Sequence, residues 1–249
     1  MWRLAQTLGV AILVVIATAC NTTLPSAEPV TTPSISHDTQ DGFMQLTYAP
    51  ARGRAPIVIL LSGFSGTPLY EDYAAKLAQE NYYVVLLDGK DILTSDETGE
   101  EKLKKAITRA QRAPAALPGR AAVIGFSYGG GAALVYGANL ADLVSNVVVY
   151  FPYTSFADAN LLAARFRVPV LFLAGQQDHY NNCCTIEMAQ AIYLAAKDRL
   201  APFTLIAYPD AGHGFSIPSI DAYRPADTED AWRRTLAALR EHLDRREAK

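Results

Sequence analysis

The sequence has little cysteine, histidine or tryptophan, and it has no run of basic residues. Its 249 residues include three cysteines, four histidines and two tryptophans. The 22 lysines and arginines nearly balance 25 acidic residues, which gives a formal net charge of −3 at pH 7. This balance gives no indication of nucleic-acid binding. There is no internal repeat and no second domain, and the 50% of hydrophobic residues predict a single domain with a substantial core.

The N-terminal residues have the pattern of an export signal. A cationic start, Met1-Trp-Arg3, precedes an apolar stretch from Leu8 to Ile16 and the small residues Ala17-Thr-Ala19. This stretch is too short and wrongly flanked for an ordinary spanning helix, so residues 1–19 are predicted to be a signal peptide. Two cleavages remain open. One resembles a bacterial lipobox and would leave Cys20 lipidated, and the other is a simple secretory site.

Residues 20–40 are rich in Thr, Ser and Pro, which is typical of a flexible tether. With a lipidated Cys20, a tether would hold the following domain, residues 41–249, near a membrane. The expected location is therefore the bacterial cell envelope, at the outer membrane or in the periplasm.

In such a compartment disulfides can form, but Cys183 and Cys184 are adjacent and no other cysteine follows Cys20. They are either two free thiols or one vicinal disulfide.

Buried strands alternate with helices along the rest of the chain. The apolar runs predict strands at residues 43–48, 56–61, 82–87, 121–126, 147–151, 170–174 and 203–208. Helical periodicity predicts helices that begin after Thr67 and after Ser127. Further helices are predicted near 98–110, 185–197 and 227–243. This alternation predicts an α/β fold with a mostly parallel, doubly wound sheet.

One strand ends in Gly125-Phe-Ser127-Tyr-Gly129, and small helix-compatible residues follow. A strand, an abrupt turn and a helix are the context in which a G-x-S-x-G pattern exposes a nucleophilic serine. We expect Ser127 to have a strained backbone, with the two glycines allowing strand and helix to cross closely. An ordinary glycine-rich turn, of the kind that can cradle a phosphate, is the alternative.

Two further candidates follow later strands. Asp178 comes after the run that ends at Gly175, and His213 comes after the run that ends at Tyr208. Ligands of such sheets bind at the carboxyl ends of the strands, where these three residues would meet. The order Ser, Asp, His is that of an α/β-hydrolase triad. The histidine would accept the serine proton, and the aspartate would orient the imidazole.

Alternatives exist for each member of this set. His179 is a rival base, and Asp158 and Asp210 are fallback acids. His37 lies in the predicted tether and His242 on the last predicted helix. The oxyanion donors are expected to be the backbone amides of Tyr128, directly after the serine, and of Phe64, in the loop after the 56–61 strand.

These motifs resemble the dienelactone hydrolase family of α/β-hydrolases over residues 43–243. The resemblance is carried by Gly125-Phe-Ser-Tyr-Gly129, Ala174-Gly-Gln-Gln-Asp178 and Tyr208-Pro-Asp-Ala-Gly-His-Gly-Phe215. It implies a hydrolase with little or no lid, no metal and no cofactor. Founding members use a cysteine nucleophile, whereas position 127 is serine. They also hold the substrate carboxylate with arginines, one of them shortly after the histidine, where this chain has Ser216-Ile-Pro218.

The sequence therefore predicts an exported serine hydrolase that cleaves small-molecule carboxylic esters through an acyl-enzyme on Ser127. A peptidase or thioesterase would use the same three residues. A non-catalytic envelope lipoprotein that kept the fold is the alternative from a different functional class.

Overall fold

An eight-stranded sheet organises residues 35–38, 42–94 and 98–243, which are the residues that the computed structural model describes. Its strands run in the order β1-β2-β4-β3-β5-β6-β7-β8. All neighbours from β4 to β8 pair in parallel, and β1 and β2 add antiparallel strands beside β4. The strands are β1 Ile35–Asp38, β2 Gln45–Tyr48, β3 Ile57–Leu61, β4 Tyr83–Leu87, β5 Ala121–Phe126, β6 Val144–Tyr150, β7 Val170–Gly175 and β8 Phe203–Tyr208.

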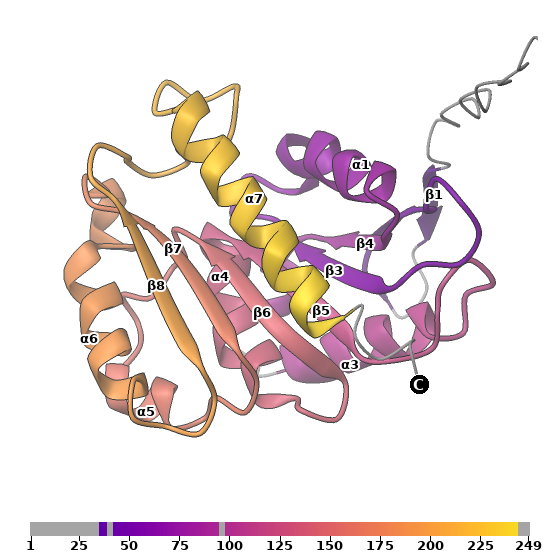
Figure 1. Cartoon of the computed structure of the whole chain (residues 1–249), viewed down its shortest axis with the longest axis horizontal. Coiled ribbons are helices and arrows are strands. Elements are labelled where there is room, and N and C mark those ends of the chain that lie inside the picture. The colour runs from indigo at the N-terminus through magenta and orange to yellow at the C-terminus, as the bar shows by residue number, and fades with distance from the viewer. Residues whose placement is uncertain (1–34, 39–41, 95–97, 244–249) are drawn as a thin grey trace, which may run out of the picture. The chain divides into compact units, whose positions relative to one another are not determined.

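Helices cover both faces of this sheet (Figure 1). The α-helices are α1 Glu71–Gln79, α2 Gly89–Ile92, α3 Gly99–Ala110, α4 Ser127–Val135, α5 Ala159–Ala163, α6 Ile186–Ala196 and α7 Pro225–His242. Short 3-10 turns are η2 Thr67–Tyr70, η3 Gly137–Asn139 and η4 Tyr180–Asn182. None of the helices in the described part of the chain is both long and apolar enough to span a bilayer.

Two apolar cores lie on opposite faces of the sheet. Successive side chains of a strand point to opposite faces, so Ile59 joins the core under α3, α4 and α6. Its neighbour Leu60 joins the core under α1 and α7. The strands β3, β4, β5 and β6 are buried throughout, which explains their continuous apolar sequences. The predicted α/β fold with a mostly parallel, doubly wound sheet is confirmed.

Some predicted boundaries are wrong. The tether was predicted to reach residue 40 and the domain to begin at residue 41, but Ile35–Asp38 form β1 and pair with β2. An edge strand is held by backbone hydrogen bonds, which polar sequences provide as well as apolar ones do. β6 begins at Val144, three residues before its predicted start, and the short α5 was not predicted. The signal peptide at 1–19 and Cys20 lie outside the described residues.

The crossing of β5 and α4 is unusually close. A Cβ at Gly125 would overlap the backbone of Gly129, and a Cβ at Gly129 would overlap the carbonyl groups of Leu61 and Ser62. The Gly129 amide also donates a hydrogen bond of 3.0 Å to the Ser62 carbonyl. Between the two glycines, Ser127 has a φ of 47°, in the left-handed region that side chains other than glycine rarely adopt.

We expect Gly129→Ala to lower the free energy of unfolding by about 1–3 kcal/mol, because the new methyl group has no room between α4 and β3. Urea denaturation of the protein measures this change. Gly119→Ala is the matched control, since Gly119 is exposed and a Cβ there meets nothing within 4 Å. The control should change stability by no more than about 0.5 kcal/mol. Equal stability of both variants would contradict the tight crossing.

Candidate active site

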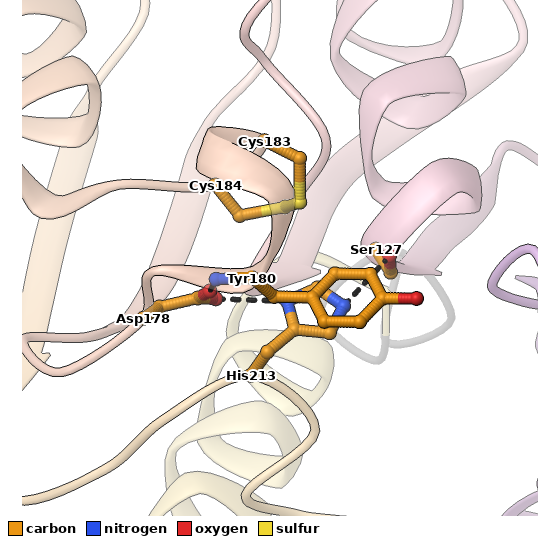
Figure 2. The surroundings of a disulfide bond; sticks show 6 residues. All are labelled: Ser127, Asp178, Tyr180, Cys183, Cys184 and His213. Carbon is orange, nitrogen blue, oxygen red and sulfur yellow. Dashed lines mark hydrogen bonds and ion pairs between the residues drawn. A yellow bond between two sulfur atoms is a disulfide. The ribbon is translucent and has the colours of Figure 1, made fainter.

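Three side chains from separate strand ends form one hydrogen-bonded chain at the carboxyl edge of the sheet (Figure 2). The His213 Nε2 atom lies 3.0 Å from the Ser127 Oγ atom, and His213 Nδ1 lies 2.8 Å from Asp178 Oδ2. Ser127 begins α4 directly after β5, whereas Asp178 follows β7 and His213 follows β8. The structure thus brings together the three residues that the sequence singles out.

The loops that carry the acid and the base are fastened to each other. The Gln177 amide donates to the Ala211 carbonyl at 2.9 Å, which links the loop after β7 to the loop after β8. The Asp178 carboxylate is buried, and its Oδ1 atom accepts a hydrogen bond of 3.2 Å from the Tyr180 amide. Its two oxygens are therefore divided between Tyr180 and His213, which fixes the plane of the carboxylate. A carboxylate held in this way can orient the imidazole through Nδ1.

Aromatic rings contact the imidazole of His213 in two orientations. The Tyr180 ring stacks on it at a centroid distance of 4.6 Å with 13° between the planes. The Phe151 ring meets it edge-on at 4.9 Å. These contacts restrict rotation of the imidazole. The sequence did not single out Tyr180, although it lies two residues after the predicted acid.

A disulfide joins Cys183 and Cys184 beside this set, with an S–S distance of 2.07 Å. It follows η4, so it lies in the same loop as Tyr180 (Figure 2). The Cys183 carbonyl accepts hydrogen bonds from the amides of Thr154 and Ser155, which anchors the loop to the segment after β6. The sulfur atoms and an imidazole nitrogen lie within 4.8 Å of one another. Because the sulfurs are bonded to each other, they offer no thiolate to a metal ion.

The alternative acids and the rival base are placed elsewhere. Asp158 caps α5 by accepting hydrogen bonds from two amides of its first turn. Asp210 is exposed and pairs with Arg224 at 3.4 Å. His179 is exposed, and the imidazole beside Ser127 is that of His213. The acid and base positions are thus filled by Asp178 and His213.

The two residues whose amides are expected to hold an oxyanion adjoin the serine, since Tyr128 follows it in the chain and Phe64 lines the same pocket. Tyr128 is the second residue of α4, where an amide has no acceptor within its own helix. Within the described ranges, neither the Tyr128 amide nor the Phe64 amide donates to another backbone carbonyl. The rings of these two residues contact each other at 5.7 Å. Both amides are therefore available to a negatively charged oxygen next to Ser127.

A pocket of about 250 Å³ opens over Ser127 and His213. Burial raises the pKa of Tyr70 in its wall, so that this phenol stays neutral near pH 7. The other residues of the lining are polar but uncharged, or apolar: Phe64, Ser65, Leu69, Phe151, Tyr180, Gly214, Ile217 and Ile220. No lysine or arginine contributes to this lining.

Comparison with known proteins assigns the chain to a family. The model of the dienelactone hydrolase family matches residues 86–243, which include all three residues of the hydrogen-bonded chain. The chain belongs to the dienelactone hydrolase family. As a member of this family, the protein is a hydrolase of the ester and lactone class.

The relatives of this dienelactone hydrolase family member that are described next share at most 30% sequence identity with it. A protein from Bradyrhizobium, named as a 2-oxo-3-(5-oxofuran-2-ylidene)propanoate lactonase, is 28% identical over 77% of this chain and 86% of its own length. An Escherichia coli protein named as a carboxymethylenebutenolidase is 30% identical, but the match spans 49% of this chain and 46% of that protein. A crystal structure named as a dienelactone hydrolase from Klebsiella pneumoniae shares the fold, with a TM-score of 0.72 and 20% identity over 82% of this chain and 96% of its own.

Proposed function

We propose that this protein is a serine hydrolase that cleaves neutral carboxylic esters through an acyl-enzyme on Ser127. The observation that carries the proposal is the position of His213, whose two ring nitrogens lie 3.0 Å from Ser127 Oγ and 2.8 Å from Asp178 Oδ2. A serine hydroxyl is a weak nucleophile near pH 7 until a base removes its proton. This geometry supplies the base and the group that orients it.

The groups of the site have defined roles in this reaction. His213 accepts the Ser127 proton as Oγ attacks the ester carbonyl, and the amides of Phe64 and Tyr128 bind the oxyanion that forms. His213 then donates the proton to the departing alcohol oxygen, which leaves an acyl group on Ser127. Water releases the acid by the same steps, with His213 again as base. Asp178 stabilises the imidazolium and remains ionised.

The lining of the serine pocket supports a neutral substrate. No lysine or arginine is in the lining, and Lys90, whose ammonium lies 5.4 Å from the centre of the Phe64 ring, is paired with Asp88 at 3.4 Å, so the lining itself offers no cationic partner to a substrate carboxylate. Ile217 and Ile220 fill the part of the wall that follows His213. An anion that loses water without gaining a charged partner is bound poorly. The pocket therefore favours esters without a charge on the acid side.

Ser127→Ala should abolish ester hydrolysis, because it removes the atom that is acylated; a loss of at least about 10⁴-fold in kcat is expected. The substrate is 4-nitrophenyl acetate, and a fluorophosphonate probe measures labelling of the serine. Ser155→Ala, at an exposed serine outside the pocket lining, is the control and should keep full activity and labelling. An unlabelled wild-type protein would favour the non-catalytic envelope lipoprotein.

Dimethyl succinate and monomethyl succinate test the charge preference, because they share an acyl skeleton and differ in one carboxylate. We expect kcat/KM per ester group to be about 10–100-fold higher for the neutral diester, the range set by an unpaired charged hydrogen-bonding group. Initial rates at pH 7 give this ratio. Equal values for the two esters would contradict a neutral-ester pocket, while leaving the role of Ser127 intact.

We also propose that the protein is exported and anchored through a lipid on Cys20. The support is the sequence alone: a cationic start, an apolar stretch and small residues directly before Cys20. When the full chain is expressed in bacteria with radiolabelled palmitate, the protein should carry label, and Cys20→Ala should remove it. An unlabelled but correctly exported wild-type protein would instead indicate simple secretory cleavage.

A further inference from the structure

A second cavity adjoins the serine pocket. Its volume is about 420 Å³, compared with about 250 Å³ for the pocket that contains Ser127. Leu69, Tyr70 and Ile217 line both cavities, so these three side chains form the wall between them. Pockets that enclose ligands of moderate size measure roughly 300–1,000 Å³, which the serine pocket alone does not reach. The second cavity would supply the missing volume.

This second cavity, hereafter the aromatic cleft, has a floor of aromatic rings and a rim of mixed charge. Its residues are Pro68, Leu69, Tyr70, Asp72, Tyr73, Lys76, Phe126, Ser216, Ile217, Pro218, Ser219, Tyr223, Thr228 and Trp232. The Tyr73 hydroxyl is hydrogen-bonded to Tyr150, and the Tyr73 ring meets Trp232 edge-on at 5.1 Å. The Lys76 ammonium lies over the Trp232 ring at 4.1 Å. Aromatic rings therefore line the cleft, and Asp72 and Lys76 give its rim no net charge.

The aromatic cleft lies on the leaving-group side of the reaction. Residues 216–219 continue directly from the loop that carries His213, and they form one wall of the cleft. His213 donates its proton to the departing alcohol, so that alcohol must lie beside the imidazole. The oxyanion donors Phe64 and Tyr128 do not line the cleft. A group extending from the alcohol oxygen past Ile217 would enter it.

One buried polar atom in the cleft has no partner in the fold. Ser216 is buried, and its Oγ atom has no hydrogen-bond partner among the described residues. Buried hydroxyl groups in folded proteins are nearly always hydrogen-bonded, because an unmade bond is costly. Ser216 lies beside Ile217 in the dividing wall and belongs to the lining of the cleft.

We propose that the aromatic cleft binds the alcohol part of the substrate and selects uncharged alcohols that carry an aromatic ring. The proposal rests on the function proposed above, in which Ser127 is acylated and the alcohol leaves beside His213. Ring faces of Tyr73 and Trp232 would contact the ring of the alcohol in offset or edge-on packing. The serine pocket would then hold only the acid part, which its small volume limits to short acyl groups.

Two acetate esters and one variant test this assignment. Ethyl acetate and 2-phenylethyl acetate form the same acetyl-enzyme, and their alcohols differ by a phenyl ring remote from the reacting carbon. We expect the wild-type kcat/KM to be at least about tenfold higher for 2-phenylethyl acetate, the effect of burying a ring. Ser219→Trp should bring the ratio close to one, because Ser219 is an exposed residue of the rim and the indole would fill the cleft.

The control is Ala226→Trp, which adds the same bulk at an exposed position in the first turn of α7, outside the lining. This variant should leave the ratio of kcat/KM for 2-phenylethyl acetate to that for ethyl acetate unchanged. Ethyl phenylacetate, an isomer of 2-phenylethyl acetate, carries the ring on the acid side. Its kcat/KM should therefore change little in Ser219→Trp. A wild-type ratio near one, a ratio unaffected by Ser219→Trp, or a loss confined to ethyl phenylacetate would each overturn the proposal.

These outcomes are distinct from a failure of the proposed function. If Ser127→Ala hydrolysed all three esters as fast as the wild type, the acyl-enzyme mechanism itself would be wrong. If Ser127→Ala is inactive and Ser219→Trp does not change the wild-type ratio, only the assignment of the aromatic cleft is wrong.

Discussion

The close crossing of β5 and α4 is the constraint on which the site depends. Two glycines let the helix backbone approach the ends of β3 and β5, and the turn between them holds Ser127 in a left-handed conformation. A parallel sheet places the carboxyl ends of β5, β7 and β8 at one edge, so the loops after these strands can reach the serine. The hydrogen bond between Gln177 and Ala211 then keeps acid and base loops together.

The sequence predicts most of the sheet because the central strands are buried on both faces, and continuous apolar runs are their direct consequence. It fails where hydrophobic burial does not determine the structure. Ile35–Asp38 form a strand through backbone pairing with β2, which composition does not reveal. The short α5 depends on the Asp158 cap rather than on an apolar stripe, so periodicity had little to detect.

The three residues of the hydrogen-bonded chain could be predicted because each follows a buried strand and because histidine is scarce. The sequence favours His213 over the rival base His179, because His179 adjoins the predicted acid on the same loop. In the structure the imidazole beside Ser127 is that of His213. The stacking of Tyr180 and the aromatic cleft were not predictable. Both arise from side chains of distant segments, and contacts of that kind leave no local pattern in the sequence.

The disulfide has a consequence for how the chain oxidises. Its cysteines are neighbours, and no other cysteine follows Cys20 in the sequence. The bond closes by local encounter, without a search along the chain, and bridges between distant segments of the domain cannot arise. It therefore encloses no loop whose freedom in the unfolded chain would be reduced, which is the usual route by which a disulfide stabilises a protein. Its influence is confined to the shape of one stretch of backbone, the stretch that presents Tyr180 to the imidazole.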